Sequence, residues 1–433
     1  MTAANAEITA ACVRPTRVRH AVLWLTVAVY MITYMDRVVI ATAVPSIEKE
    51  FGFSLVTIGW IFSAFQIGYA LCQIPGGWLG DRFGPRRALS GVVIWWSMFT
   101  VATAMMWSAG SMIVCRFLFG VGEAGAFPIA TRSLSQWILP AERGWAQGLT
   151  HAGARLGGAI TPVLVVFLIA HYGWRTPFAL FALIGLAWAA LWFWYYRDSP
   201  AEHRSVNSAE RELIASALGN TTSRRVSVPW RRLLRNPQIW LLSAMYFCYA
   251  YSLGIFLTWF PKYLDDARDF DLARMGLYAS APLLAGVTGD IAGGWTSDQL
   301  LKRFGNLKLA RRIVAVVGFV IAGVTIPLAT LASDPIVSVA YFCVGVFGLE
   351  LTVGVSWAVT LDLGGSYAGS VSAVMNTFGN VGGAIAAALT GYIVTHAGWD
   401  PAFFVVAGLS LIAAVLFLRI DASQRLYSSA TAS

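Results

Sequence analysis

Residues 76–87 read GGWLGDRFGPRR and lie between two long apolar stretches of the chain. A weaker copy reads GGWTSD at 293–298 and continues as KRFG at 302–305. Charges at the end of a membrane helix need only solubility and topology to explain them, but the spacing Gly-Gly-x-x-x-Asp-Arg-x-Gly is too specific for that alone. The two copies therefore mark equivalent helix ends in two related parts of the chain.

A second pair of segments repeats in the same order. GGAI occurs at 157–160 and again at 382–385, and each copy runs through an apolar stretch to a His-x-Gly-Trp sequence. The offset between the copies is 225 residues at both ends of the match. Membrane transporters are often built from such repeats, with the substrate between them. We therefore expect two related halves around a central cavity.

The composition is that of a membrane protein. Of 433 residues, 57% are hydrophobic and only 12% are charged, whereas a soluble domain has about 25% charged residues. A hydrocarbon core of about 30 Å requires about 20 apolar residues per helix. Six stretches of that length precede a polar break and six follow it, which predicts an all-α protein with twelve transmembrane helices, at 21–43, 55–78, 88–107, 110–132, 145–170, 176–196, 238–262, 275–299, 310–332, 336–361, 368–396 and 400–419.

The chain start and the cysteines exclude other protein classes. Arginines precede the first apolar stretch, and Ala41-Thr42-Ala43 resembles the cleavage site of a signal peptide. Asp36 and Arg37 interrupt this stretch, so we read it as a membrane helix. The five cysteines are scattered, without CxxC or metal-ligand spacing, and we expect packing residues rather than a disulfide framework or a metal site. Without a nucleophile triad or a phosphate loop, the sequence predicts no enzyme and no cofactor.

The distribution of Lys and Arg predicts the orientation, because these residues collect in cytoplasmic loops. Counted outward from both chain ends, the loops on one side contain only five of the 31, namely Lys49, Arg175, Lys262, Arg268 and Arg274. The other side, with both termini and the central linker, is therefore predicted to be cytoplasmic. The net charge of +9 follows from this topology, and no nucleic-acid partner is expected.

The predicted organisation is a cytoplasmic tail, a six-helix half, a cytoplasmic linker, a second six-helix half and a second cytoplasmic tail, at 1–20, 21–196, 197–237, 238–419 and 420–433. The linker is polar and rich in Arg where its flanks are apolar. Asn207-Ser208-Ala209-Glu210 resembles a capping box that opens a short surface helix through about Leu218. The linker is a solvated hinge or, alternatively, a contact for anionic lipids.

At these motifs the sequence resembles a known family. Residues 76–87 resemble the loop motif between helices 2 and 3 of the major facilitator superfamily, and the weaker copy lies between helices 8 and 9. Other motifs, which together cover nearly the whole chain, resemble the anion:cation symporter family, namely Tyr34-x-Asp36-Arg37, Arg116, Gly122-Glu123-Ala124-Gly125, Phe127-Pro128, Trp174-Arg175, Ser199-Pro200-Ala201-Glu202-His203, Ser356-Trp357-Ala358, Asp362 and Asn376-x-x-Gly379-Asn380-x-x-Gly383.

The resemblance implies a function and a location. Members of the symporter family import hexuronates, aldonates, aldarates, tartrate, phthalate and related carboxylates, and eukaryotic relatives handle sialic acid and glutamate. It implies proton-coupled import of a small organic anion by a monomer in the lipid bilayer of the cell (inner) membrane, through alternating access. In the superfamily the loop motif latches the two halves in the outward-open state, and here its residues are Gly77, Asp81, Arg82, Gly84, Arg86 and Arg87.

Four charged residues lie inside the first half, namely Asp36, Arg37, Arg116 and Glu123. A charge at the bilayer centre costs about 2.5–3.5 kcal/mol on insertion scales, so such groups usually face a cavity and a partner. Asp36 and Arg37 point about 100° apart, whereas Arg116 and Glu123, seven residues apart, share a helix face. Arg can hold a carboxylate bidentately, and burial favours the protonated form of a carboxyl group. The four residues suit a proton-coupled anion site, and the alternative is a static charge network.

The resemblance assigns roles to these and other residues. Arg37 would hold the substrate carboxylate, and Asp36 and Glu123 would carry the protons. Arg116 would tune Glu123 in the binding site. The remaining substrate contacts would come from polar and aromatic residues on cavity-facing helices, namely Tyr34, Tyr69, Ser356, Trp357, Asn376 and Asn380.

Spacing adds two observations about the polar candidates. Gln66, Tyr69 and Gln73 follow one face of a helix, and such a polar stripe favours a cavity, with helix packing as the alternative. Asn376 and Asn380 are four residues apart and also share a face. For Asn380 the alternative to a substrate contact is an interhelical hydrogen bond.

Two charged residues depart from the commoner family pattern. Arg155 lies where relatives often have a small or neutral polar residue, and its facing depends on the alignment. If it lines the cavity, a second Arg favours a substrate with two anionic ends, such as an aldarate, tartrate or a sulfonated acid. Glu350 is a third protonatable group, a partner for Arg155 across the halves, or a residue bonded to the helix that carries Asp290.

Three functions from different classes are compatible with these residues. Proton-coupled import of an organic anion needs the buried arginines together with the buried acids. Efflux of a drug or metabolite on the same fold would not need Arg37 in the first helix. A transporter-like sensor would not need an intact gating motif, and the chain has no output domain. The residues therefore favour import.

Overall fold

The computed structural model describes residues 14–139, 142–218, 230–364 and 368–424, which form helices joined by short connections and contain no strand. The all-α prediction is therefore confirmed. The helices of the first part are α1 (Val18–Phe51), α2 (Leu55–Ala104), α3 (Ala109–Glu123), α4 (Ala126–Trp137), α5 (Arg143–Tyr172) and α6 (Thr176–Tyr195). The linker contains η2 (Pro200–Glu202), α7 (Ser208–Leu218) and α8 (Trp230–Leu233). The helices of the second part are α9 (Pro237–Thr258), α10 (Phe260–Arg268), α11 (Leu272–Phe304), α12 (Leu307–Leu331), α13 (Pro335–Gly364), α14 (Ala368–Ala397) and α15 (Trp399–Arg419).

Within the described residues, ten helical stretches are long and apolar enough to cross a membrane. One of them, α2, contains two of the predicted spans, and the predicted span in α11 is not among the ten. Large apolar side chains point outward along these helices, for example Ile74, which is 77% exposed. Such a surface suits contact with lipid. The membrane-protein prediction is confirmed, and the count of twelve crossings stays a prediction.

Parts of several predictions lie outside the described residues. They are Cys12, positions 1–13 and 425–433 of the predicted tails, and positions 219–229 of the predicted linker.

Gly84 turns the chain back within α2. Gly76 and Val92 both lie 3.3 Å from the Cβ position of Gly125, although 16 residues of straight helix would separate them by about 24 Å. At Gly84 the backbone adopts φ 76° and ψ 152°, a region in which side chains other than glycine are strained. The carboxylate of Asp198 occupies the space beside it, since a Cβ at Gly84 would be 2.6 Å from Oδ2. Asp198 Oδ1 also accepts a hydrogen bond from the backbone N–H of Arg86, at 2.9 Å.

We expect Gly84→Ala to destabilise the protein, because the new methyl group meets both an unfavourable backbone conformation, which costs about 1–3 kcal/mol, and the Asp198 carboxylate. The measurement is the thermal unfolding midpoint in detergent. Gly91→Ala in the same helix is the matched control, because a Cβ there meets nothing within 4 Å. Equal midpoints for the two variants would contradict this role for Gly84.

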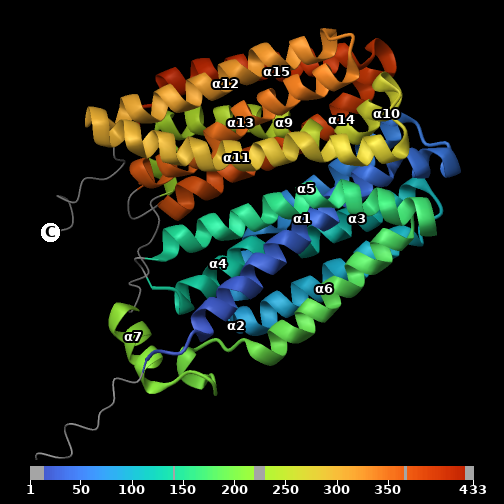
Figure 1. Cartoon of the computed structure of the whole chain (residues 1–433). Coiled ribbons are helices and arrows are strands. Elements are labelled where there is room, and N and C mark those ends of the chain that lie inside the picture. Colours follow the sequence, from blue (N-terminus) through green and yellow to red (C-terminus); the bar gives the residue numbers. More distant parts are fainter. Residues whose placement is uncertain (1–13, 140–141, 219–229, 365–367, 425–433) are drawn as a thin grey trace, which may run out of the picture.

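The helices form two bundles, one of α1 to α6 and one of α9 to α15 (Figure 1). In the first bundle α2 packs on α3 and α6, and α1 packs on α5. In the second, α13 packs on α11 and α12, and α9 packs on α14. The two bundles meet where α2 contacts α14 and where α5 contacts α11. The segments that carry the GGAI repeats, in α5 and α14, therefore both lie at this boundary.

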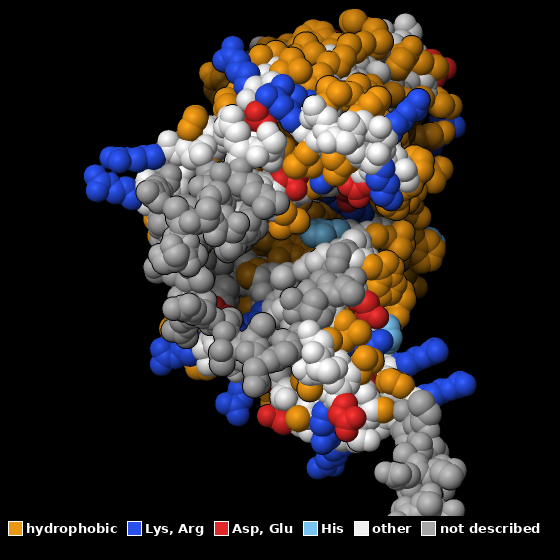
Figure 2. Space-filling model, turned by 90° about the vertical axis from the view of Figure 1, so that its left-hand side faces the viewer, with side chains coloured by type: hydrophobic (Ala, Val, Ile, Leu, Met, Phe, Trp, Pro, Cys, Tyr) orange, Lys and Arg blue, Asp and Glu red, His pale blue; other side chains and the backbone are white. Residues whose placement is uncertain are grey.

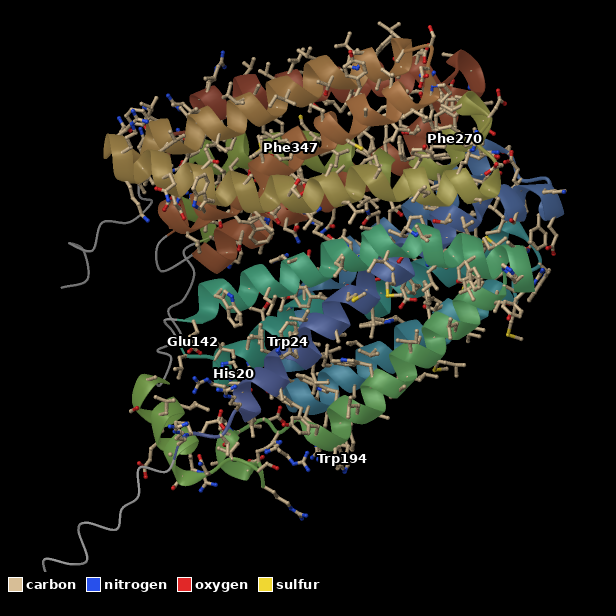
Figure 3. All side chains as sticks on the ribbon, viewed as in Figure 1. His20, Trp24, Glu142, Trp194, Phe270 and Phe347 are labelled. Atoms are coloured by element: carbon tan, nitrogen blue, oxygen red, sulfur yellow. The ribbon has the colours of Figure 1, made fainter. Side chains whose placement is uncertain are left out.

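The molecule is hollowed between the bundles on the face that carries α7 and the start of α1 (Figure 2). The opposite end is closed, and there Lys262 of α10 forms ion pairs with Glu48 of α1 and, at 2.7 Å, with Asp266. The Lys262 side chain is buried. Phe270 lies at this closed end, whereas His20 and Glu142 lie at the end with α7 (Figure 3). One buried cation thus links the two bundles at the closed end.

We expect Lys262→Gln to open the closed end more often, because Glu48 and Asp266 then lack their shared cation. The measurement is the electron spin distance between labels at the exposed positions Tyr172 of α5 and Ala273 of α11, in a background without native cysteines. A population at longer distance should emerge.

Arg175→Gln is the matched control, because Arg175 pairs with Glu50 at 2.6 Å within the first bundle. If both variants gave the wild-type distances, Lys262 would not hold this end closed.

The described part of the linker is anchored to the first bundle. The predicted surface helix is α7, and Asn207 Oδ1 accepts the backbone N–H of Glu210 at 2.9 Å. The capping-box prediction is wrong in one respect, because the Glu210 carboxylate instead accepts the backbone N–H groups of Val18 and Arg19, at 3.3 and 3.2 Å. An acid at the start of a helix stabilises its free N–H groups. Glu210 therefore caps α1 rather than its own helix.

Candidate functional site

Arg37 and Glu123 form an ion pair in the first bundle. Arg37 Nε donates to Glu123 Oε1 at 2.5 Å, with the Glu123 side chain fully buried and that of Arg37 17% exposed. Arg37 Nη2 and Glu123 Oε2 are both buried and have no hydrogen-bond partner among the described residues. The pair therefore has one free donor and one free acceptor beside it.

Aromatic rings surround the Arg37 guanidinium. Its Cζ atom lies 4.7 Å from the centroid of the Tyr69 ring and 5.3 Å from those of Tyr34 and Phe65. Phe127 completes the set at 5.5 Å. Cations are attracted to the faces of such rings, and the attraction grows when water is excluded. The rings hold the charge in place without using its hydrogen-bond donors.

Glu123 lies at a junction within one membrane span. The span predicted at 110–132 is confirmed, because Ala109–Trp137 is one stretch that is long and apolar enough to cross a membrane. Within it α3 ends at Glu123 and α4 begins at Ala126, while the backbone at Ala124 and Gly125 keeps right-handed helical angles. Gly76 packs directly on this junction, where its missing side chain lets α2 approach the backbone of Gly125. The span predicted at 238–262 divides into α9 and α10.

Asp36 and Arg116 lie deeper in the same bundle. Asp36 is fully buried and accepts a hydrogen bond from Trp96 Nε1 at 3.1 Å. Arg116 is also buried, and its Cζ atom lies 4.3 Å from the centroid of the Phe119 ring. Asp36 therefore points toward α2, whereas Arg37 points toward Glu123 of α3. This difference in direction is expected for adjacent residues of a helix. In this conformation neither Asp36 nor Arg116 is open to the hollow.

Arg155 and Glu350 connect the two bundles. Arg155 Nη1 of α5 donates to Glu350 Oε1 of α13 at 2.5 Å, and the Tyr249 hydroxyl donates to the same oxygen at 3.2 Å. The ion pair is one of the three alternatives that the sequence left open for Glu350. Tyr34, Arg155 and Glu350 share the lining of a small pocket with residues of α9, α11 and α13. Arg155 therefore faces the boundary between the halves.

The predicted polar candidates divide into two groups. Asn380 donates to Gln73 at 3.1 Å, an interhelical hydrogen bond between α14 and α2, and Trp357 Nε1 donates to the Tyr246 hydroxyl at 3.2 Å. Gln66 lies against Gly383 of α14, and Asn376 is half-buried. These residues lie at or near the boundary between the bundles.

Ser356 does not join this group. It is buried, and its hydroxyl donates to the carbonyl of Thr352 in its own helix, at 2.7 Å. Its side chain also lies against Met245 Sδ, at 3.9 Å. Because Ser356 and Trp357 are adjacent in α13, they point in different directions. A role for Ser356 in the site stays a prediction.

The gating motif makes its contacts within the first bundle. Asp81 pairs with Arg132, and Arg86 donates through Nε to the carbonyl of Phe193 at 2.8 Å. The other motif residues lie around them: Arg82 over the Trp78 ring, Gly77 against Pro128, Gly84 at the bend and Arg87 exposed. Among the described residues none of these contacts reaches the second bundle, so they do not bridge the halves in this conformation.

Three residues near the site were not among the predictions. His151 precedes Arg155 by one helical turn, and its ring centroid lies 5.8 Å from that of Tyr30 and 6.4 Å from that of Trp357. Tyr246 and Tyr249 lie on one face of α9. The sequence did contain a signal for them, since residues three or four apart share a helix face. His151 is four residues from Arg155, and Tyr246 is three residues from Tyr249.

Comparisons with known proteins give the family. The model of the Major Facilitator Superfamily matches residues 26–387. "Probable sulfoacetate transporter SauU" of Cupriavidus necator is 40% identical over 407 residues, with 94% of each chain covered. "Hexuronate transporter" of Bacillus subtilis is 32% identical, covering 90% of this chain and 91% of that one. "Probable galactarate/D-glucarate transporter GudP" of the same organism is 31% identical, covering 93% and 91%.

The fold is also that of solved transporters. A bacterial homologue of the human lysosomal transporter Spinster, in an inward-facing and unoccupied conformation, gives a TM-score of 0.74 at 16% identity, covering 93% of this chain and 97% of that one. The family model and these relatives cover nearly the whole chain, its repeats and its gating motif. The chain therefore belongs to the Major Facilitator Superfamily and is a transporter, not an enzyme.

Proposed function

We propose that this protein imports a small organic anion together with protons across the cell (inner) membrane, by alternating access. Relatives named as transporters of sulfoacetate, hexuronate and galactarate/glucarate support an anionic substrate. The proposal includes twelve membrane crossings, a monomer, and an orientation with both chain ends in the cytoplasm.

The observation that carries the proposal is the Arg37–Glu123 pair. Arg37 is a largely buried cation surrounded by aromatic rings, and its Nη2 has no hydrogen-bond partner among the described residues. A substrate carboxylate or sulfonate is the kind of group that a guanidinium binds most specifically. Glu123 competes for the same guanidinium, because its Oε1 accepts from Nε at 2.5 Å. Substrate and internal carboxylate are therefore alternative partners of one cation.

The protonation state of Glu123 decides whether Arg37 pairs with Glu123 or with the substrate. When Glu123 is protonated, it loses its charge and its hold on Arg37, and the substrate anion takes its place. When the substrate leaves on the other side, Glu123 returns its proton and pairs with Arg37 again. An empty, unprotonated site and a loaded, protonated site thus have the same net charge, which lets both states reorient through the bilayer.

The other candidates support this exchange. Asp36 is proposed as the second proton carrier, and Arg116 as the neighbour that stabilises the negative charge of Glu123. Tyr34 and Tyr69 position Arg37 and line its substrate side. Trp357, Asn376 and Asn380 of the second half are proposed to contact the remainder of the substrate.

We expect Glu123→Gln to abolish proton-driven accumulation while leaving counterflow exchange measurable, because the variant keeps Arg37 but has no carboxylate to accept a proton. The measurement is uptake of radiolabelled acid into proteoliposomes, with the acid that gives the largest thermal shift among sulfoacetate, hexuronates, aldarates and tartrate. Glu202→Gln is the matched control, since Glu202 is an exposed linker residue. Full accumulation by Glu123→Gln would remove Glu123 from coupling.

A further inference from the structure

Arg155 is a further, largely buried cation of the first bundle. Its side chain is only 13% exposed, and that of Glu350 is 1% exposed. A buried guanidinium needs a paired charge, since the cost of removing it from water is otherwise not repaid. Glu350 belongs to the other bundle, so this pair joins two parts of the protein that separate during transport. Such a pair has to break and form again in every cycle, if the proposed alternating access holds.

Tyr34 neighbours both arginines. Its ring centroid is 5.3 Å from Arg37 Cζ, and it lines the same pocket as Arg155 and Glu350. It also packs on Gly158, where a Cβ would lie 3.4 Å from Tyr34 Cδ1. A short molecule bound along this one side chain would have a cation on each side of it.

The two carboxylate oxygens of Glu350 differ in their hydrogen bonds. Its Oε1 accepts from both Arg155 and Tyr249, whereas Oε2 is buried and has no hydrogen-bond partner among the described residues. Gly286 and Gly289 of α11 leave room for its side chain, because a Cβ at either position would come within 3.0–3.1 Å of it. A carboxylate with one unsatisfied buried oxygen is a poor permanent structural group.

The surroundings contain several other titratable and charged groups. They come from four helices: Arg155 and His151 from α5, Tyr246 and Tyr249 from α9, Asp290 from α11 and Tyr34 from α1. Asp290 brings a second carboxyl group near Arg155 and Glu350. His151, four residues before Arg155 in α5, is exposed.

We propose that Arg155 is a second anion-binding residue, that Glu350 is its displaceable internal counter-ion, and that the substrate is a short dianion with one anionic group at Arg37 and the other at Arg155. This inference rests on the proposed function. The O–H bond formed on Glu350 removes its charge, its ion pair with Arg155 breaks, and the second carboxylate or sulfonate of the substrate accepts from Arg155 instead. One dianion then enters with two protons, one on each displaced glutamate, and the charge of the site stays balanced.

The test uses purified full-length protein and equilibrium binding. The dianions are sulfoacetate and tartrate, and the single-ended analogues are ethanesulfonate and propionate. The wild type should bind a dianion at least tenfold more tightly than the analogues. Arg155→Gln should lose this preference and keep its affinity for the analogues. Arg37→Gln should lose both, and Arg274→Gln, at a 70% exposed side chain, should change neither.

Two variants separate binding from folding. Arg155→Gln leaves Glu350 buried without a counter-ion, so the double variant Arg155→Gln, Glu350→Gln removes both charges and should also bind the single-ended analogues without a dianion preference. Glu350→Gln alone should bind a dianion about tenfold more tightly than the wild type at pH 8, because Arg155 is then permanently free. At pH 5 the two proteins should bind equally.

The outcomes distinguish the two levels of the proposal. If the wild type binds no anion, or if Arg37→Gln binds like the wild type, the proposed function fails and the dianion site with it. If the wild type binds dianions and analogues equally, or if Arg155→Gln weakens both to the same extent, the second site is refuted while anion transport stands. No gain in affinity for Glu350→Gln at pH 8 would refute its role as counter-ion.

Discussion

A charge inside the bilayer must have a partner, and much of this structure follows from that constraint. An unpaired charge at the bilayer centre costs about 2.5–3.5 kcal/mol on insertion scales, and the interior of the first half carries two acids, Asp36 and Glu123, and three arginines, Arg37, Arg116 and Arg155. Arg37 pairs with Glu123, and Arg155 pairs with Glu350 across the halves. Each pair neutralises the charge of its arginine without a ligand. On the proposed mechanism a transported anion displaces the paired carboxylate, which ties its binding to a proton.

The two pairs differ in what they connect. Arg37 and Glu123 lie within one bundle, where aromatic rings surround the guanidinium. Arg155 and Glu350 lie on opposite sides of the boundary at which the halves move. On the proposed mechanism the first pair senses the presence of an anion, and the second converts that presence into a change of contact between the bundles.

Small residues let the closed end form. A Cβ at Gly59 of α2 would come within 2.8 Å of the carbonyl oxygen of Ala387 in α14, so the two helix backbones touch there, as small residues allow in membrane proteins. Lys262 adds a buried ion pair at the same end. The opposite end has a hollow instead (Figure 2). Backbone contact at one end and a hollow at the other are what a transporter needs to expose its site to one side at a time.

The fold was predictable because composition, repeats and the motif at 76–87 all indicate the same architecture. The neighbourhood of Arg37 and Glu123 was also predictable, because charges in apolar helices are few. The facing of individual residues was not, since helices that are apolar on every side give no periodic signal. The sequence therefore did not show that the Ser356 hydroxyl bonds within its own helix, and it left the partner of Glu350 open. Contacts between distant segments, such as Glu210 with the start of α1, depend on packing that no local pattern records.

The central claim is that the anion and the protons cross together. The most direct measurement places the wild-type protein in liposomes with a trapped pH-sensitive dye, at equal pH on both sides and with the membrane potential clamped. Radiolabelled sulfoacetate is added outside, and a second sample receives ethanesulfonate. The expected result is acidification of the lumen in step with sulfoacetate entry, at about two protons per molecule. Entry of the label without any change in internal pH would contradict coupled transport.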